Sequence, residues 1–335
     1  MTIQKCLSPG YWFKVIGLWF CILISCRGFA IGGDLIRNEA AVAETDSAQL
    51  VLLLDSLARH EQNDLLQKHF LSVLTIIQDT THGYEKFYSA KEYYYEALHF
   101  FRNEGARFET YVNGPRPLMM AFQSPTDHKN SFYWLFLPRK FQKDKKDYSF
   151  YMELHGSGGG MNDNPRNMLL EPLGSHPGGV TVQGYRKEGF FIYPWGRGDK
   201  NYRGIAEQDI FECLHHFDSL FTTAPQRQFL FGFSMGGGGT FHIASLSPRR
   251  WTAIGTISAA FNEVNEDNIR KIKHLPVWMI WGEKEYWAIN CRKVKDLLIR
   301  AGVKLVWREV PGGAHDYDGK YQVELMDWFL KQVIR

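Results

Sequence analysis

Short apolar runs recur at regular intervals along the C-terminal two thirds of the chain, and amphipathic stretches separate most of them. Each run has the length of a buried strand. A polar turn joins the first two runs and predicts a hairpin. Apolar strands that alternate with amphipathic helices predict an α/β fold, in which a mostly parallel sheet is covered by helices on both faces. The predicted strands are residues 118–122, 132–137, 148–154, 189–193, 228–233, 253–257, 277–281 and 304–310, and the predicted helices are 205–221, 288–300 and 320–333.

The region before this pattern has a helical period instead. Leucines recur at helical spacing between residues 50 and 57, and apolar residues do so again between 66 and 77. Residues 79–83 interrupt the period, and an aromatic-rich run follows. The sequence therefore predicts a helical N-terminal segment over residues 31–105 and a main domain over 115–335.

Residues 1–30 have the composition of an export signal. Lys5 and Lys14 precede an apolar run at residues 15–24, which is too short to span a bilayer comfortably. Cleavage after Ala30 is one interpretation. A second is a lipobox ending at Cys26, in which case the signal extends to residue 25 and Cys26 carries a lipid anchor. The first two interpretations predict an exported protein that is periplasmic, secreted or anchored to a membrane as a lipoprotein. A third alternative is an uncleaved membrane anchor, which the short apolar run disfavours.

Composition limits the classes of partner and cofactor. The net charge is +3, from 39 basic and 36 acidic residues, so nothing favours a nucleic-acid partner. Of the five cysteines, three lie in the signal or at its edge, and the remaining two, Cys213 and Cys291, form either one disulfide or two buried thiols. No spacing of cysteine or histidine is typical of a metal site, so we expect neither a metal nor an organic cofactor.

The most informative stretch is the turn Gly232-Phe-Ser-Met-Gly236, which directly follows an apolar strand. A nucleophilic serine needs its hydroxyl held clear of the backbone on a sharp strand-to-helix turn, where flanking side chains would collide. Four glycines, residues 236–239, follow Met235 in the opening turns of the predicted helix, although each costs about 1 kcal/mol of helix propensity. Close packing of this helix on the neighbouring strands is the physical reason that we expect.

A second glycine-rich turn, Leu154-His-Gly-Ser-Gly-Gly-Gly160, also follows a strand. Its glycines allow backbone N–H groups to point at a developing oxyanion. A phosphate-binding loop would end in Gly-Lys-Ser/Thr, which is absent here. We expect the oxyanion hole to consist of the N–H of Ser157 or Gly158 together with that of Met235.

Two further turns carry acid and base candidates. Trp281-Gly-Glu-Lys-Glu285 follows one strand, and either of its glutamates could orient a catalytic imidazole. Val310-Pro-Gly-Gly-Ala-His315 follows the last strand, and its flexible turn could present His315 to Ser234 as general base. All of these turns lie at carboxyl ends of strands, where ligands bind in parallel sheets.

The chain order Ser234, acid, His315 resembles that of the α/β-hydrolases. Residues 115–335 resemble this superfamily, and within it the secreted esterases and polyester depolymerases that border the prolyl oligopeptidases. The resemblance implies a catalytic triad of Ser234, Glu285 and His315, because the family's acid lies three residues after the turn glycine, here Gly282. Glu263, after the preceding strand, is the alternative acid.

This set of residues predicts hydrolysis of a carboxylic ester through an acyl-enzyme on Ser234. The expected substrate is a small-molecule ester or an acyl or feruloyl ester of a polysaccharide, because Trp195, Tyr202 and Trp287 are aromatic residues predicted to lie near the site and to bind it. Two alternatives stay open: a peptidase of prolyl-oligopeptidase type, and a hydrolase fold used only for binding.

Overall fold

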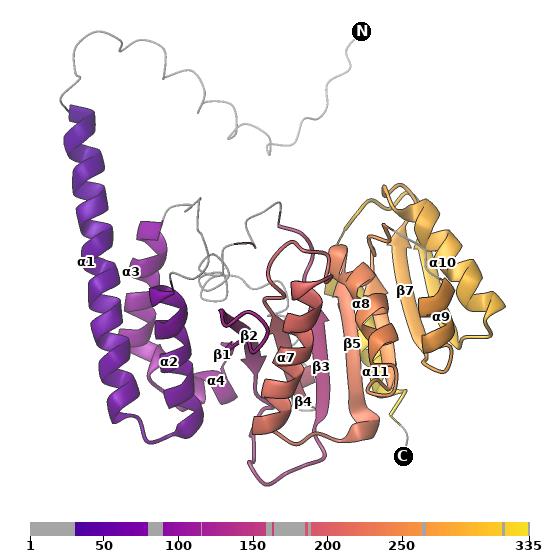
Figure 1. Ribbon diagram of the computed structural model, residues 1–335, viewed down its shortest axis with the longest axis horizontal. Helices are drawn as coiled ribbons and strands as arrows, with labels where there is room; N and C mark the ends of the chain where they lie inside the picture. Colours follow the sequence, from indigo (N-terminus) through magenta and orange to yellow (C-terminus); the bar gives the residue numbers. More distant parts are fainter. Residues whose placement is uncertain are drawn as a thin grey trace, which may run out of the picture.

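The computed structural model describes residues 31–79, 90–114, 116–158, 163, 185–186, 189–262, 266–316 and 319–333 (Figure 1). The signal and Cys26 lie outside them. The helices are α1 (Ile31–His60), α2 (Asp64–Gln78), α3 (Ala90–Phe100), a π-helical turn (Phe101–Gly105), α4 (Phe108–Val112), α7 (Ile205–Leu220), α8 (Met235–Leu246), α9 (Glu266–Ile272), α10 (Ala288–Arg300) and α11 (Gly319–Leu330). The strands are β1 (Leu118–Gln123), β2 (Asn130–Phe136), β3 (Ser149–Leu154), β4 (Gly189–Pro194), β5 (Gln228–Phe233), β6 (Ala253–Ile257), β7 (Val277–Gly282) and β8 (Leu305–Val310).

The strands form one eight-stranded sheet in the order β1-β2-β4-β3-β5-β6-β7-β8. The predicted hairpin is present: β1 pairs antiparallel with β2, in a register that places Ala121 opposite Phe132. β2 also runs antiparallel to β4, and every pair from β4 to β8 is parallel. The α/β class predicted from the alternating pattern is therefore confirmed.

The two faces of the sheet pack against different helices, and aromatic side chains make many of these contacts. Phe150 of β3 packs against Phe217 of α7, with ring centroids 4.8 Å apart. Its neighbour Tyr151 points to the opposite face, where it and Phe229 of β5 contact Phe329 of α11. Successive side chains of a strand point to opposite faces, so buried strands need an apolar residue at nearly every position. This explains why the strands read as continuous apolar runs.

The N-terminal helices join the sheet through its first strand. The Met119 N–H donates to Nδ1 of His69 at 2.8 Å, and the Ala121 N–H donates to Oγ of Ser72 at 2.8 Å. Both acceptors lie on α2, which packs along β1. The segment predicted as a helical addition thus shares its packing with the main domain.

His69 is fully buried, and burial lowers its pKa to about 3. Its Nδ1 accepts a backbone N–H, while its Nε2 lies 3.1 Å from the hydroxyl of Tyr111, which itself donates to the carbonyl of Gly105. These partners fix a neutral tautomer with the proton on Nε2. The sequence did not predict the π-helical turn that places Gly105 there.

Cys213 and Cys291 are both free and buried, so the structure has the second of the two predicted cysteine arrangements. In the part of the chain that the structure describes, no helix is long and apolar enough to cross a membrane.

Candidate active site

Ser234 lies at the turn between β5 and α8 in a left-handed backbone conformation, with φ 54° and ψ −119°. A side chain at Gly232 would collide with the backbone of Gly236, and a side chain at Gly236 would collide with the carbonyl of Leu154. The Gly-x-Ser-x-Gly pattern is therefore a steric requirement of this turn. Strain of this kind, costing about 1–3 kcal/mol, is typical of functional sites.

The remaining glycines of the run allow α8 to approach its neighbours closely. A Cβ on Gly237 would lie 2.7 Å from the Cβ of Ala259, and one on Gly239 would enter the ring of Tyr202. The close packing expected from the sequence is thus present on two sides of the helix. Its effect is to hold the start of α8, and with it Ser234, against the ends of β3 and β6.

The structure brings Ser234, His315 and Glu285 together. Nε2 of His315 lies 2.9 Å from Oγ of Ser234, and Nδ1 lies 3.1 Å from Oε2 of Glu285. The three residues follow β5, β8 and β7, whose carboxyl ends meet at one edge of the sheet. The glutamate side chain is fully buried, whereas the histidine is 31% exposed. A buried carboxylate on Nδ1 orients the imidazole so that Nε2 can accept the serine proton.

Glu283, the other glutamate of the same turn, has a different partner. Its Oε2 accepts the N–H of Gly312 at 2.7 Å, on the loop that leads to His315. It therefore fastens that loop without contacting the imidazole. Glu263, the alternative acid, lies outside the described residues.

The Glu285 carboxylate contacts a thiol as well as the His315 imidazole. Sγ of Cys291, on α10, lies 3.8 Å from Oε1 of Glu285 and 3.4 Å from the carbonyl oxygen of Ala259. Burial, followed by the charge of Glu285, raises the pKa of this thiol, so it stays protonated and donates. The sequence did not indicate this contact, because the two residues lie on different elements.

The loop after β3 passes beside Ser234. A Cβ built on Gly156 would lie 3.3 Å from the Cβ of Ser234. The Met235 N–H belongs to the first turn of α8, where N–H groups have no acceptor within the helix. The Gly158 N–H, however, donates to both carboxylate oxygens of Asp199 at 3.0 Å. The N–H of Gly158 therefore already has an acceptor, and it does not fit the predicted role of donor to the oxyanion.

Two of the three aromatic residues predicted to bind substrate belong to the core instead. Trp195 is 2% exposed and Tyr202 is 1% exposed. Trp195 stacks on Phe132, and Tyr202 packs against the glycine run of α8. The prediction was wrong for both, because their turns follow strand ends but direct the rings inward.

Trp287 does lie at the site. Its ring is half-buried, and its centroid is 5.1 Å from that of His315. Phe233, which the sequence analysis did not single out, stacks on the imidazole at 5.0 Å. These two rings form an apolar surface beside the histidine. Among the described residues, no cluster of histidine, cysteine or carboxylate side chains could hold a metal ion.

No protein-family model matches the chain. Its fold is similar to those of solved structures that cover two thirds of it or slightly less. A thermostable esterase has a TM-score of 0.54 and 19% identity, covering 66% of this chain and 64% of its own. A ferulic acid esterase has a TM-score of 0.51 and 16% identity, covering 65% and 98%. A protein from Bacteroides ovatus assigned as a dipeptidyl aminopeptidase IV has a TM-score of 0.50 and 13% identity, covering 67% and 36%. The chain has the α/β-hydrolase fold.

Proposed function

We propose that the chain is a serine hydrolase that cleaves carboxylic esters through an acyl-enzyme on Ser234. One observation carries the proposal: a continuous path of hydrogen bonds runs from Oγ of Ser234 through both nitrogens of His315 to Glu285, at 2.9 and 3.1 Å. Nucleophile, base and orienting acid in this geometry are the parts that acyl transfer requires. A fold used only for binding has no need of the strained turn at Ser234.

In the proposed reaction, Oγ of Ser234 attacks the ester carbonyl carbon while its proton passes to Nε2 of His315. Glu285 stabilises the imidazolium through Nδ1–H. The carbonyl oxygen becomes an oxyanion, which accepts the N–H of Met235 and an N–H of the loop after β3. His315 then returns the proton to the leaving alcohol, and the acyl group remains on the serine. Water activated by the same histidine releases the acid.

The proposed substrate is an acyl or feruloyl ester of a polysaccharide, or a small ester of similar chemistry. Trp287 and Phe233 support this choice, because flat apolar rings beside His315 suit an aryl or sugar group. The similar fold of a ferulic acid esterase agrees with it. The residues that carry the mechanism need no metal or organic cofactor, and we propose that activity survives chelators.

A fluorophosphonate probe tests the proposal, because it reacts only with an activated serine. We expect labelling of the wild-type protein and none of Ser234→Ala, whose turnover should fall by about 10⁴-fold or more while the fold is retained. Hydrolysis is then measured across nitrophenyl esters, acetylated and feruloylated oligosaccharides, and peptide amides. Preference for amides would make the protein a peptidase, and silence toward both the probe and every substrate would make it a binding protein.

A further inference from the structure

Three hydrogen-bonded contacts connect the loop after β3 to the loop after β4. Nε2 of His155 lies 2.9 Å from the carbonyl oxygen of Trp195, and the Tyr202 hydroxyl donates to the carbonyl of His155 at 2.9 Å. The third is the bond from the Gly158 N–H to Asp199. The loop proposed to form the oxyanion hole therefore takes its shape from residues 195–202.

The bond to Asp199 differs from the other two because its acceptor is a carboxylate. Both oxygens lie 3.0 Å from the Gly158 nitrogen, so the N–H points between them. Hydrogen bonds to an ionised acceptor are about twice as strong as neutral ones. An N–H held in this way is not available to an oxyanion, since two anions sharing one donor would repel each other.

The backbone around Asp199 is itself held in place. Its N–H donates to Oδ1 of Asp163 at 2.9 Å. Arg197, Gly198 and Gly196 all have positive φ angles, which makes the turn tight. The buried guanidinium of Arg197 anchors the turn by donating to Asp209 at 2.8 Å. The carboxylate therefore approaches Gly158 from a rigid support, as preorganised sites require.

We propose that Asp199 is the positioning residue of the oxyanion hole. By binding the Gly158 N–H it fixes the loop after β3 where that loop passes beside Ser234, and with it the backbone N–H that the proposed oxyanion hole takes from this loop. This inference rests on the proposed function. It gives the Arg197–Asp199 turn a role in the reaction.

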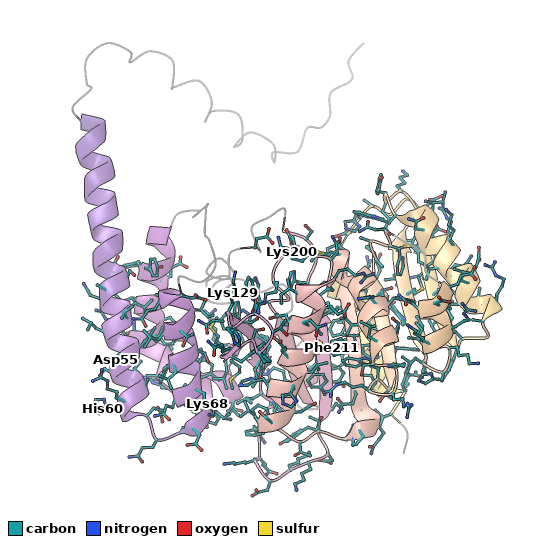
Figure 2. All side chains as sticks on the ribbon, viewed as in Figure 1. Asp55, His60, Lys68, Lys129, Lys200 and Phe211 are labelled. Carbon is teal, nitrogen blue, oxygen red and sulfur yellow. The ribbon has the colours of Figure 1, made fainter. Side chains whose placement is uncertain are left out.

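The test compares Asp199→Ala with Asp199→Asn, whose side-chain oxygen still accepts the N–H. The matched control is Asp55→Ala, which removes an exposed aspartate of α1 that pairs with Arg59 at 2.6 Å (Figure 2). For each variant, kcat and KM are measured on a nitrophenyl ester. The inhibition constant of a trifluoromethyl ketone is measured too, because its adduct with Ser234 places an oxyanion in the hole. Thermal unfolding reports on the fold.

For Asp199→Ala we expect kcat to fall by about 10²–10³-fold and the ketone to bind correspondingly less tightly, the loss typical of one oxyanion donor. KM should stay within about threefold, because ground-state binding is unchanged. Asp199→Asn and the control should stay within about tenfold of the wild type in kcat. A merely structural role would lower the unfolding temperature without this selective loss of ketone affinity.

Three results would overturn the inference: unchanged kcat in Asp199→Ala, equal loss in Asp199→Asn, or a faster Asp199→Ala. The last would mean that Gly158 is the donor and that Asp199 competes with the substrate. If Asp199→Ala does not fold, Asp199→Ser, which is too short to reach the N–H, is judged by the same criteria. A wild-type protein without activity or probe labelling would instead refute the proposed function, and this inference with it.

Discussion

The carboxylate of Glu283 accepts the N–H of Gly312 at 2.7 Å, so the glutamate nearest the turn glycine holds the loop that carries His315. Two carboxylates of one short turn thus contact the histidine loop in different ways. Glu283 binds its backbone, and Glu285 binds its imidazole. This division leads to opposite expectations for the two amide substitutions.

Glu285→Gln should lower kcat by about 10⁴-fold, because an amide favours the wrong imidazole tautomer. Glu283→Gln should stay within about tenfold of the wild type, or 1.4 kcal/mol in the barrier, since its amide oxygen still accepts the Gly312 N–H. Steady-state kinetics on one nitrophenyl ester measures both. Reversed results would assign the acid to Glu283, and two active variants would make Glu263 the residue to test.

Cys291→Ala should reduce kcat by about tenfold, because it removes a donor from the buried carboxylate of Glu285. Cys291→Ser should retain most activity, since a hydroxyl donates at least as well as a thiol. The control is Cys213→Ala, a buried change in α7 that should lower the unfolding temperature but leave kcat unchanged. Full activity in Cys291→Ala would show that the thiol does not position the acid.

The stability of the protein should fall as the pH is lowered from about 6.5 toward 3, partly through His69. Burial lowers the pKa of this histidine from 6.5 to about 3 in the folded state. The unfolded chain therefore binds a proton that the folded chain rejects, and the free energy of unfolding drops by up to about 1.4 kcal/mol per pH unit.

His69→Asn tests this pH dependence. The variant should be less stable at pH 7 by about 1–3 kcal/mol, because the Tyr111 hydroxyl loses its donor. Its stability should nevertheless vary less between pH 6.5 and 3. Asp209, whose pKa burial raises to about 6, acts with the opposite sign, but it is present in both proteins and cancels in the comparison. Parallel pH profiles from urea unfolding would contradict the role of His69.

The mature protein should begin at Cys26 or at Ile31, according to which export signal operates. Intact-mass analysis of native material separates these outcomes, because a lipidated Cys26 adds the mass of its acyl chains. Cys26→Ser is the control: it should abolish lipidation but leave cleavage before Ile31 unaffected. Recovery of the chain with Met1 retained would contradict both interpretations.

The sheet and the arrangement of the triad were predictable because their signals are local. Each strand is an apolar run bounded by turn residues, and the turns carrying Ser234, Glu285 and His315 follow such runs directly. The four glycines after Met235 were also informative, because few other structures require them. Once parallel strands were expected, these turns had to meet at one edge of the sheet.

The contacts between elements were not predictable in this way. Trp195 and Tyr202 lie on the loop that follows β4, yet the first ring stacks on Phe132 of β2 and the second packs against α8. The hydrogen bond from Gly158 to Asp199 joins residues 41 positions apart in the sequence, and no periodic pattern of residues predicts it. A short helix such as α9 has too few turns to show a period. These features depend on side-chain packing, which a single sequence does not specify.

The hydrogen bonds that β1 donates to side chains of α2 limit how far the chain can be shortened from its N-terminus. A shortened chain starting at Pro117 would keep Ser234, Glu285 and His315, but the N–H groups of Met119 and Ala121 would lose His69 and Ser72. An uncovered edge strand pairs readily with the edge of another molecule. We therefore expect the helices before the sheet to keep molecules from associating through this edge, and a shortened chain should include α2 to avoid such association.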